Sequence, residues 1–234
     1  MTRNSLRKTL QVLYLTMSVV YILSVQLNDS LTYYIKPLMM PLLMGYYLSS
    51  TPVRDKFLLR ALVFCWLGDI FLMQVMGTGV DFLLGVLAFL AGQVSYIMCF
   101  RRLTWPRTQH GSPMFTFLTM SMAMVFAGYV FSLVFPLAGE LQMPVLIYMI
   151  VIVSMFYHAV RRRERTSPGS FTSLVIGAAA FLVSDAVLAL NKFHGSIPFE
   201  WFLVMSTYFS AQYLIVRGVL LHPAEQPVRE AAYA

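Results

Sequence analysis

Apolar runs of about 20 residues, separated by short polar segments, constrain this 234-residue chain more than any other feature of its sequence. A helix that spans a bilayer needs about 20 consecutive apolar residues, and each run is long enough. The eight runs lie near residues 9–27, 32–49, 57–76, 81–100, 114–135, 141–160, 170–190 and 199–220. The 59% share of hydrophobic residues and the 12% share of charged residues leave little material for a soluble domain. We therefore predict an all-α, polytopic membrane protein in which residues 1–234 form a single bundle of eight transmembrane helices.

Basic residues predict the orientation of this bundle. The first run lacks a convincing signal-peptide cleavage site, so we expect it to be retained. The chain then crosses the membrane eight times, and both termini lie on the same side. That side collects most of the 17 Lys and Arg: Arg3, Arg7, Lys8, Arg54, Lys56, Arg60, Arg101, Arg102, Arg107, Arg161, Arg162, Arg163, Arg165, Arg217 and Arg229. The opposite loops keep only Lys192, and Lys36 lies inside the second run. The positive-inside rule therefore predicts that both termini are cytoplasmic, in the inner membrane if the host is a bacterium.

The net charge of +7 does not indicate a nucleic-acid partner, because the basic residues lie in short clusters between apolar runs. The largest cluster, RRRER at residues 161–165, is typical of an anchor at a cytoplasmic helix end. We therefore expect no nucleic-acid partner, and the sequence leaves the oligomeric state open.

Three charged residues lie where the hydrocarbon of the bilayer makes a charge costly. Asp69, in ALVFCWLGDIFLM, lies ~10 Å from the outer end of its span and Asp185 ~8 Å, at about 1.5 Å per residue, and Lys36 lies at a similar depth. Alone, a lysine could extend to the interface and an aspartate could bind a neighbouring helix. Other polar side chains on spans that can line the same space are Gln93, Tyr96, Tyr208 and Gln212. Together with Pro37 and Pro41, which free backbone carbonyls, they predict a polar cavity in the outer half of the membrane.

A weak internal similarity points to a four-plus-four repeat. LGDIFLM and VSDAVLA each place a small residue before an aspartate, and the spans that follow carry AGQ and SAQ. A repeat of this kind would bring Asp69 and Asp185 to equivalent positions facing a common axis.

The residue types favour acid and base chemistry. Two carboxyl groups held close together in a low dielectric do not both ionise readily, so one tends to keep its proton while the other is charged. The sequence has no GxSxG, no HExxH and no glycine-rich phosphate loop, and its four histidines lie on different segments. We therefore expect no metal and no cofactor. The pattern suits attack of water on a lipid from the bilayer, with Lys36 or Lys192 available to a phosphate group.

Several motifs together resemble the YhhN family, which includes the eukaryotic TMEM86 lysoplasmalogenases. They are KPLMMPLL at 36–43, LGD at 67–69, a Gly-Gln-x-x-Tyr run at 92–96, SDAVLALNKF at 184–193 and TYFSAQYLIVRG at 207–218. The similarity covers about residues 30–220. It implies a multi-pass hydrolase that cleaves the vinyl ether bond of lysoplasmalogens, taking a lysophospholipid from the bilayer and releasing a fatty aldehyde and glycerophosphoethanolamine or glycerophosphocholine.

This chemistry fits the residues, because vinyl ether hydrolysis starts with protonation of an alkene carbon and passes through an oxocarbenium ion that water traps. The resemblance implies that Asp69 and Asp185 are the catalytic pair. It implies headgroup or cavity roles for Lys36, Asn191, Lys192, Tyr208 and Gln212, and we expect Gln93 and Tyr96 to line the same site. Many relatives have a histidine in place of Gln93. Glutamine, unlike histidine, cannot shuttle a proton near neutral pH.

Two other functions remain open on the sequence alone. A transporter or proton-coupled channel also needs intramembrane Asp and Lys residues and often contains a repeat. A non-catalytic lipid-binding scaffold would tolerate replacement of the aspartates by asparagine.

Overall fold

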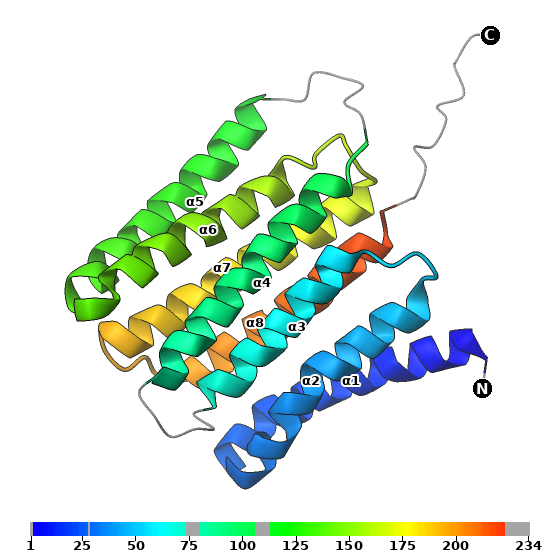
Figure 1. Cartoon of the computed structure of the whole chain (residues 1–234), viewed down its shortest axis with the longest axis horizontal. Coiled ribbons are helices and arrows are strands. Elements are labelled where there is room, and N and C mark those ends of the chain that lie inside the picture. The colour runs from blue at the N-terminus through cyan, green and yellow to red at the C-terminus, as the bar shows by residue number, and fades with distance from the viewer. Residues whose placement is uncertain (1, 28, 74–79, 106–112, 223–234) are drawn as a thin grey trace.

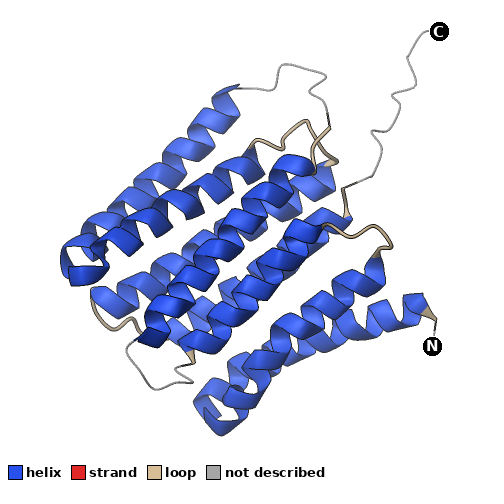
Figure 2. Ribbon diagram, in the orientation of Figure 1, coloured by secondary structure: helices blue, strands red, loops and turns tan. Residues whose placement is uncertain are grey.

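The computed structural model describes residues 2–27, 29–73, 80–105 and 113–222, and over these residues it is a bundle of helices with no strand (Figures 1 and 2). The helices are α1 (Arg3–Leu27), α2 (Asp29–Ser50), α3 (Lys56–Leu72), α4 (Val80–Arg102), α5 (Pro113–Val134), α6 (Gln142–Val160), α7 (Pro168–Phe193) and α8 (Glu200–Leu220). Two short 3-10 helices, Phe135–Leu137 and Gly139–Leu141, join α5 to α6. Each predicted run coincides with one helix, so the all-α class is confirmed. The main differences are an earlier start of α1 and an earlier end of α3, since residues 74–79 are outside the described part.

Six segments of the described chain are long and apolar enough to cross a bilayer: Arg3–Val25, Val80–Arg102, Pro113–Leu137, Gly139–Val160, Pro168–Phe193 and Glu200–Leu220. The other two helices differ for identifiable reasons. α3 has only 17 residues, and α2 contains two prolines and a lysine. These two helices carry Lys36 and Asp69, whereas Asp185 lies on α7, one of the six long apolar segments.

Three helical hairpins build the bundle, because α1 packs along α2, α3 along α4, and α7 along α8. α6 lies against α4 and α7, whereas α5 touches mainly α6 and α7 at one side of the molecule (Figure 1). Glycine permits the close α7–α8 contact, since a Cβ at Gly177 would lie 3.0 Å from the Ala211 carbonyl oxygen. A Cβ at Gly218 would likewise lie 3.0 Å from Leu174. The α3–α4 and α7–α8 hairpins therefore form a rigid centre, and α5 is the least supported helix.

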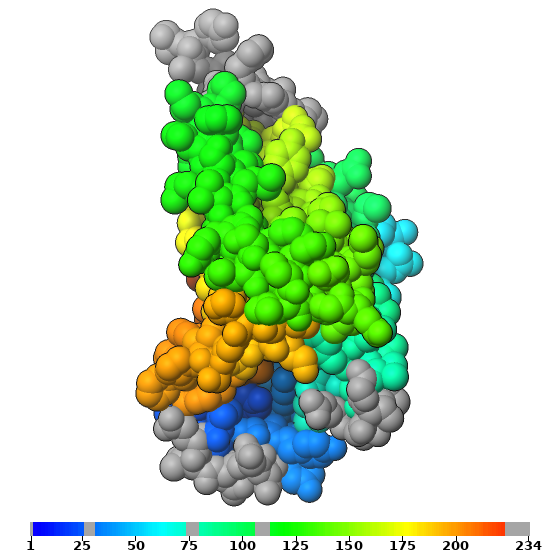
Figure 3. Space-filling view, turned by 90° about the vertical axis from the view of Figure 1, so that its left-hand side faces the viewer, coloured from blue at the N-terminus to red at the C-terminus, as the bar shows by residue number. Residues whose placement is uncertain are grey.

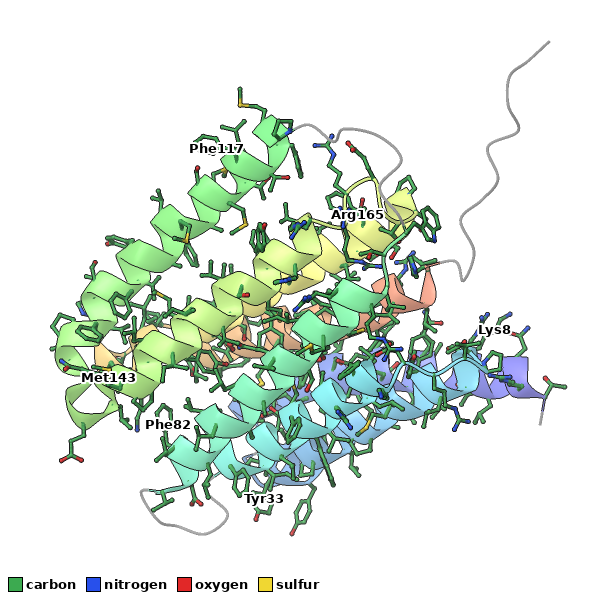
Figure 4. All side chains as sticks on the ribbon, turned by 45° about the horizontal axis from the view of Figure 1, so that its top comes forward. Lys8, Tyr33, Phe82, Phe117, Met143 and Arg165 are labelled. Carbon is green, nitrogen blue, oxygen red and sulfur yellow. The ribbon has the colours of Figure 1, made fainter. Side chains whose placement is uncertain are left out.

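The basic residues gather at one end of the helices. Figure 4 shows Lys8 and Arg165 at this end and Tyr33, Phe82 and Met143 towards the opposite end. We call these the basic end and the opposite end. Basic residues from separate parts of the described chain thus lie at the same end of the folded bundle, as expected when successive helices cross a membrane in alternating directions.

The two prolines of α2 lie inside a continuous helix, and a side chain replaces one lost backbone bond. Pro41 has no N–H to donate to the carbonyl of Pro37, four residues earlier. The indole Nε1–H of Trp66 in α3 donates to that carbonyl at 2.7 Å. A freed carbonyl of α2 thus meets protein, and the bond fixes α2 against α3 beside Lys36.

One arginine of the RRRER cluster is structural. Arg162 is fully buried, with 0% of its surface exposed, although its neighbours on either side are exposed. Its Nε and Nη2 donate to the Leu103 carbonyl at 3.0 and 2.8 Å, and Nη2 also donates to Ser170 Oγ at 3.2 Å. The Ser170 hydroxyl in turn donates to the Gly218 carbonyl at 2.6 Å. Arg162 therefore joins the ends of α4, α6 and α8 to the start of α7.

Replacing Arg162 with methionine should lower the free energy of unfolding by about 2–4 kcal/mol, because several bonds to a charged donor are lost and a carbonyl loses its partner. Arg161→Met is the matched control, since Arg161 is exposed and lies 5.5 Å from the Tyr157 ring centroid. The melting temperatures of the detergent-purified variants measure the difference. Equal melting temperatures for the two variants would show that Arg162 has no special structural role.

His222 gives the basic end a dependence on pH. Its Nδ1 lies 2.7 Å from Thr166 Oγ1, and its ring stacks near Trp105 with centroids 5.6 Å apart. Burial, and then the charge of Arg162, lower the pKa of His222 to about 4, so the folded protein holds the neutral ring.

We expect stability to be highest above the unfolded-state pKa of about 6.5 and to fall as the pH drops towards 4, because the unfolded chain then binds the proton more readily. The melting temperature of the wild type should decrease between pH 7 and pH 5. His222→Gln should show a smaller decrease over the same range. A variant with an unchanged pH dependence would contradict this role.

Candidate functional site

Asp185 is the centre of a hydrogen-bond network that joins three helices. From α6, the Tyr148 hydroxyl donates to Asp185 Oδ2 at 2.6 Å. From α4, Gln93 Nε2 donates to the same oxygen at 3.0 Å and also to the Tyr148 hydroxyl at 2.8 Å. Within the described chain, no group donates to Asp185 Oδ1. Oδ1 is not one of the described side-chain atoms that are fully buried without a partner, and Asp185 lines a cavity.

The cavity has a volume of about 120 Å³ and lies between α4, α5, α6 and α7. Its lining consists of Leu72, Phe82, Leu83, Val86, Phe89, Phe126, Ala127, Val130, Phe131, Val134, Leu141, Pro144, Val145, Tyr148, Met149, Ile152, Leu182, Asp185, Ala186, Leu188, Ala189 and Phe193. Asp185 and Tyr148 alone contribute polar side-chain oxygens to this lining. The surface is otherwise hydrocarbon, which suits an apolar chain with one reactive polar point.

Figure 3 shows the side of the molecule on which this cavity lies, with the green side chains of α5 and α6 above the orange end of α7. The lining runs from the opposite end of the helices, at Phe82 and Phe193, to one turn beyond Asp185, at Leu182. Asp185 is eight residues from the end of α7, so it lies about 12 Å from that end of the cavity.

Asp69 forms a separate pair with a different tyrosine. Its carboxylate is 3% exposed, and Oδ2 accepts a hydrogen bond from the Tyr208 hydroxyl at 2.8 Å. Lys36 is also buried and interacts electrostatically with Asp69 and with Glu200. Neither Asp69 nor Lys36 lines the cavity. The pair adjoins the cavity through Phe89, a lining residue whose ring centroid lies 5.9 Å from that of Tyr208.

The two aspartates are therefore near each other but not in direct contact. Asp69 and Asp185 interact electrostatically, yet each carboxylate has its own hydrogen-bond partners. The structure places a cation near Asp69 and an open cavity beside Asp185. Two carboxyl groups of the same type thus have different surroundings, which is the arrangement that separates an acid from a base.

A third buried polar pair joins α4 to α8. The Tyr96 hydroxyl donates to Gln212 Oε1, and both side chains are fully buried. Gln93 Oε1 and Gln212 Nε2 are buried without a hydrogen-bond partner among the described residues. The bonds Gln93–Asp185, Tyr208–Asp69 and Tyr96–Gln212 each join the α3–α4 hairpin to the α7–α8 hairpin.

The last two predicted residues lie outside this cluster. Asn191 Oδ1 accepts from the Ile197 backbone N–H at 2.9 Å, so it shapes the connection between α7 and α8. Lys192 is exposed, and its ammonium lies 4.9 Å from the ring centroid of Phe82, a residue of the cavity lining. Lys192 thus lies at the end of the cavity lined by Phe82 and Phe193, whereas Lys36 is not in contact with the lining through any described interaction.

Tyr148 was not among the residues predicted from the sequence. It stands in QMPVLIYMIVIV, a run otherwise apolar apart from its first residue, and tyrosine is common enough in membrane helices to attract no notice. One signal was present: Tyr148 lies seven residues from the start of the 141–160 run, near the depth of Asp185. The described chain contains no cluster of three His, Cys, Asp or Glu residues that could hold a metal ion.

The fold and the buried polar network define a polytopic membrane protein with a site enclosed by its helices. The YhhN family model matches residues 31–219, and the chain belongs to the YhhN family. It is an integral, multi-pass membrane protein. No solved structure matches it significantly.

Curated relatives are named lysoplasmalogenases. The chain is 29% identical to lysoplasmalogenase TMEM86A of Bos taurus over 174 residues, which cover 72% of the chain and 66% of that protein. It is 31% identical to the TMEM86A of Homo sapiens over 159 residues, covering 66% of the chain and 61% of that protein. It is 28% identical to lysoplasmalogenase TMEM86B of Sus scrofa over 146 residues, covering 62% and 57%. The matches thus cover slightly less than two thirds of the length of these relatives.

Proposed function

We propose that this protein hydrolyses the vinyl ether bond of lysoplasmalogens, releasing a fatty aldehyde and a glycerophospho-alcohol. One observation carries the proposal: Asp185 presents a free carboxyl oxygen to an otherwise hydrocarbon cavity, with Tyr148 as the only other polar group in the lining. A lysoplasmalogen has one reactive polar group, the enol ether between its apolar chain and its glycerol, and this arrangement matches a hydrocarbon surface with one polar point. The family and the names of the relatives support the same substrate class.

In the proposed mechanism Asp185 is the acid. It gives its proton to the alkene carbon that is not bonded to oxygen, and the adjoining carbon becomes an oxocarbenium ion. Water adds to that carbon and loses a proton to a carboxylate, giving a hemiacetal. The hydroxyl of the hemiacetal then gives its proton to a carboxylate while the bond to the glycerol oxygen breaks, that oxygen takes a proton from a carboxyl group, and the aldehyde leaves. Each proton given is returned, so no cofactor is required.

Asp69 is proposed as the anion of the pair. Lys36 favours its charged form, and a fixed negative charge near the cavity stabilises the oxocarbenium ion as it forms. Asp185, with no cation described beside it and one oxygen open to the cavity, is better placed to carry the proton. Tyr208 holds Asp69 in position and Gln93 holds Asp185, while Tyr96 and Gln212 bond to each other.

The headgroup phosphate is assigned to Lys192. Asp185 and Lys192 are seven residues apart on α7, which is about 10 Å along the axis. Seven bonds separate the phosphorus of a lysoplasmalogen from the carbon to be protonated, or about 8 Å when extended. A lysine with a flexible side chain at the open end of the cavity therefore matches the substrate in length, and Lys36 is proposed to act on Asp69 instead.

The topology remains a proposal of its own. Both termini are placed in the cytoplasm, all eight helices cross the bilayer, and the cavity opens in the outer half of the membrane. Reporter fusions at the C-terminus test this. Activity of a periplasmic or extracellular reporter alone would exclude the orientation.

The activity assay distinguishes the proposed function from its rivals. Purified protein is incubated with lysolipids that differ only in the bond at the first glycerol carbon: vinyl ether, alkyl ether or acyl. We expect release of aldehyde from the vinyl ether alone. No release from any of them, together with uptake of protons or solute by proteoliposomes, would favour a transporter.

A further inference from the structure

We infer that Tyr148 is a positioning residue, which fixes Asp185 so that the oxygen carrying the reactive proton faces the cavity. This inference rests on the proposed function and adds a residue to it. Tyr148 has a place both in the cavity lining and in the hydrogen-bond network around Asp185. Its hydroxyl makes the shorter of the two hydrogen bonds that this carboxyl group receives from the described residues, at 2.6 Å against 3.0 Å from Gln93.

Two donors converge on one oxygen of Asp185. The Tyr148 O–H and the Gln93 Nε2–H both point at Oδ2, at 2.6 and 3.0 Å. A proton placed on Oδ2 would meet these two donors, so one of them would have to turn away without an acceptor. A proton on Oδ1 leaves both bonds intact. The arrangement therefore directs the acid proton to Oδ1, the oxygen that faces the cavity.

Gln93 also fixes the direction of the tyrosine hydroxyl. Because Gln93 Nε2 donates to the Tyr148 oxygen at 2.8 Å, that oxygen is already an acceptor, and its hydrogen is left to point at Asp185. Gln93 is fully buried on α4, Tyr148 lies on α6 and Asp185 on α7. Three helices thus hold the carboxyl group in one rotamer, whereas Asp69 receives a single tyrosine bond.

Tyr148→Phe tests the inference, because the ring is kept and only the hydroxyl is removed. We expect kcat for vinyl ether hydrolysis to fall at least about tenfold while KM stays within about twofold. Binding of the saturated alkyl ether lysolipid, which cannot be protonated at carbon, should be unchanged. The solvent deuterium isotope effect on kcat should rise, since proton transfer becomes more fully rate-limiting.

Tyr129→Phe is the matched control, because Tyr129 is exposed on α5 and its hydroxyl has no hydrogen bond with the described residues. Its kinetics should equal those of the wild type. Gln93→Met removes the other donor to the same oxygen and gives a second test if Tyr148→Phe does not fold. It should also lower kcat more than it raises KM.

The inference is overturned if a well-folded Tyr148→Phe keeps kcat within about twofold, or if its loss lies in KM and in analogue binding. Failure of the proposed function looks different. In that case the wild type releases no aldehyde from a vinyl ether, or Asp185→Asn is as active as the wild type. The two failures are therefore separable in one set of assays.

Discussion

Asp185→Asn should lose about 10²–10⁴-fold in the turnover of a vinyl ether lysolipid, the range that a general acid contributes. An amide has nearly the size of a carboxyl group, and its oxygen can still accept the bonds from Tyr148 and Gln93. It cannot give a proton to an alkene carbon. The loss should therefore appear in kcat, with little change in binding of the saturated ether analogue. Aldehyde release by the purified protein is the measurement.

A second aspartate provides the control. Asp55 caps α3 at the basic end, where its Oδ1 accepts from the backbone N–H groups of Phe57 and Leu58 at 2.8 and 3.0 Å. Asparagine caps helices about as well as aspartate does, so Asp55→Asn should remain stable and active. Near-normal turnover by a well-folded Asp185→Asn would mean that Asp185 only joins helices, and the proposed chemistry would be lost with it.

Asp69→Asn should also remove most turnover, because the anion that stabilises the oxocarbenium ion is lost and Lys36 keeps its positive charge without its partner. If Asp69 and Asp185 act on one substrate as a unit, the double variant should be little worse than the more severe single variant, since such effects are strongly non-additive. The three variants are compared by single-turnover kinetics. A double variant whose loss equals the product of the two single losses would show that the aspartates act independently.

The two single variants should differ in severity because the two aspartates lie at different distances from the cavity. Asp185 lines the cavity. Asp69 is separated from the cavity by Tyr208 and Phe89, so it would act on a substrate there through its charge. Charge acts over several ångströms in a low dielectric, so Asp69 need not touch the substrate to matter. We accordingly expect Asp69→Asn to be the milder of the two single variants.

The sequence by itself determined the helices and which of them carry the charged residues. Each span is apolar because it must satisfy its backbone bonds alone in lipid, so its length and position depend little on its neighbours. Because a charge in lipid is costly, an aspartate in ALVFCWLGDIFLM or a lysine beside Pro37 indicates polar surroundings at that position along its helix. The distance of a residue from the end of its helix follows from the number of residues between them, at about 1.5 Å per residue.

Only the tertiary structure decided which polar groups meet. Partners across helices depend on the rotation of each helix about its axis and on the spacing between helices, and neither is a property of a single run. Hence Tyr148, not a charged residue, became the closest partner of Asp185, and Asp69 paired with Tyr208 instead of sharing a hydrogen bond with Asp185. The same geometry buried one arginine of RRRER against a carbonyl, and the space between α4, α5, α6 and α7 placed this cavity beside Asp185 and not beside Asp69.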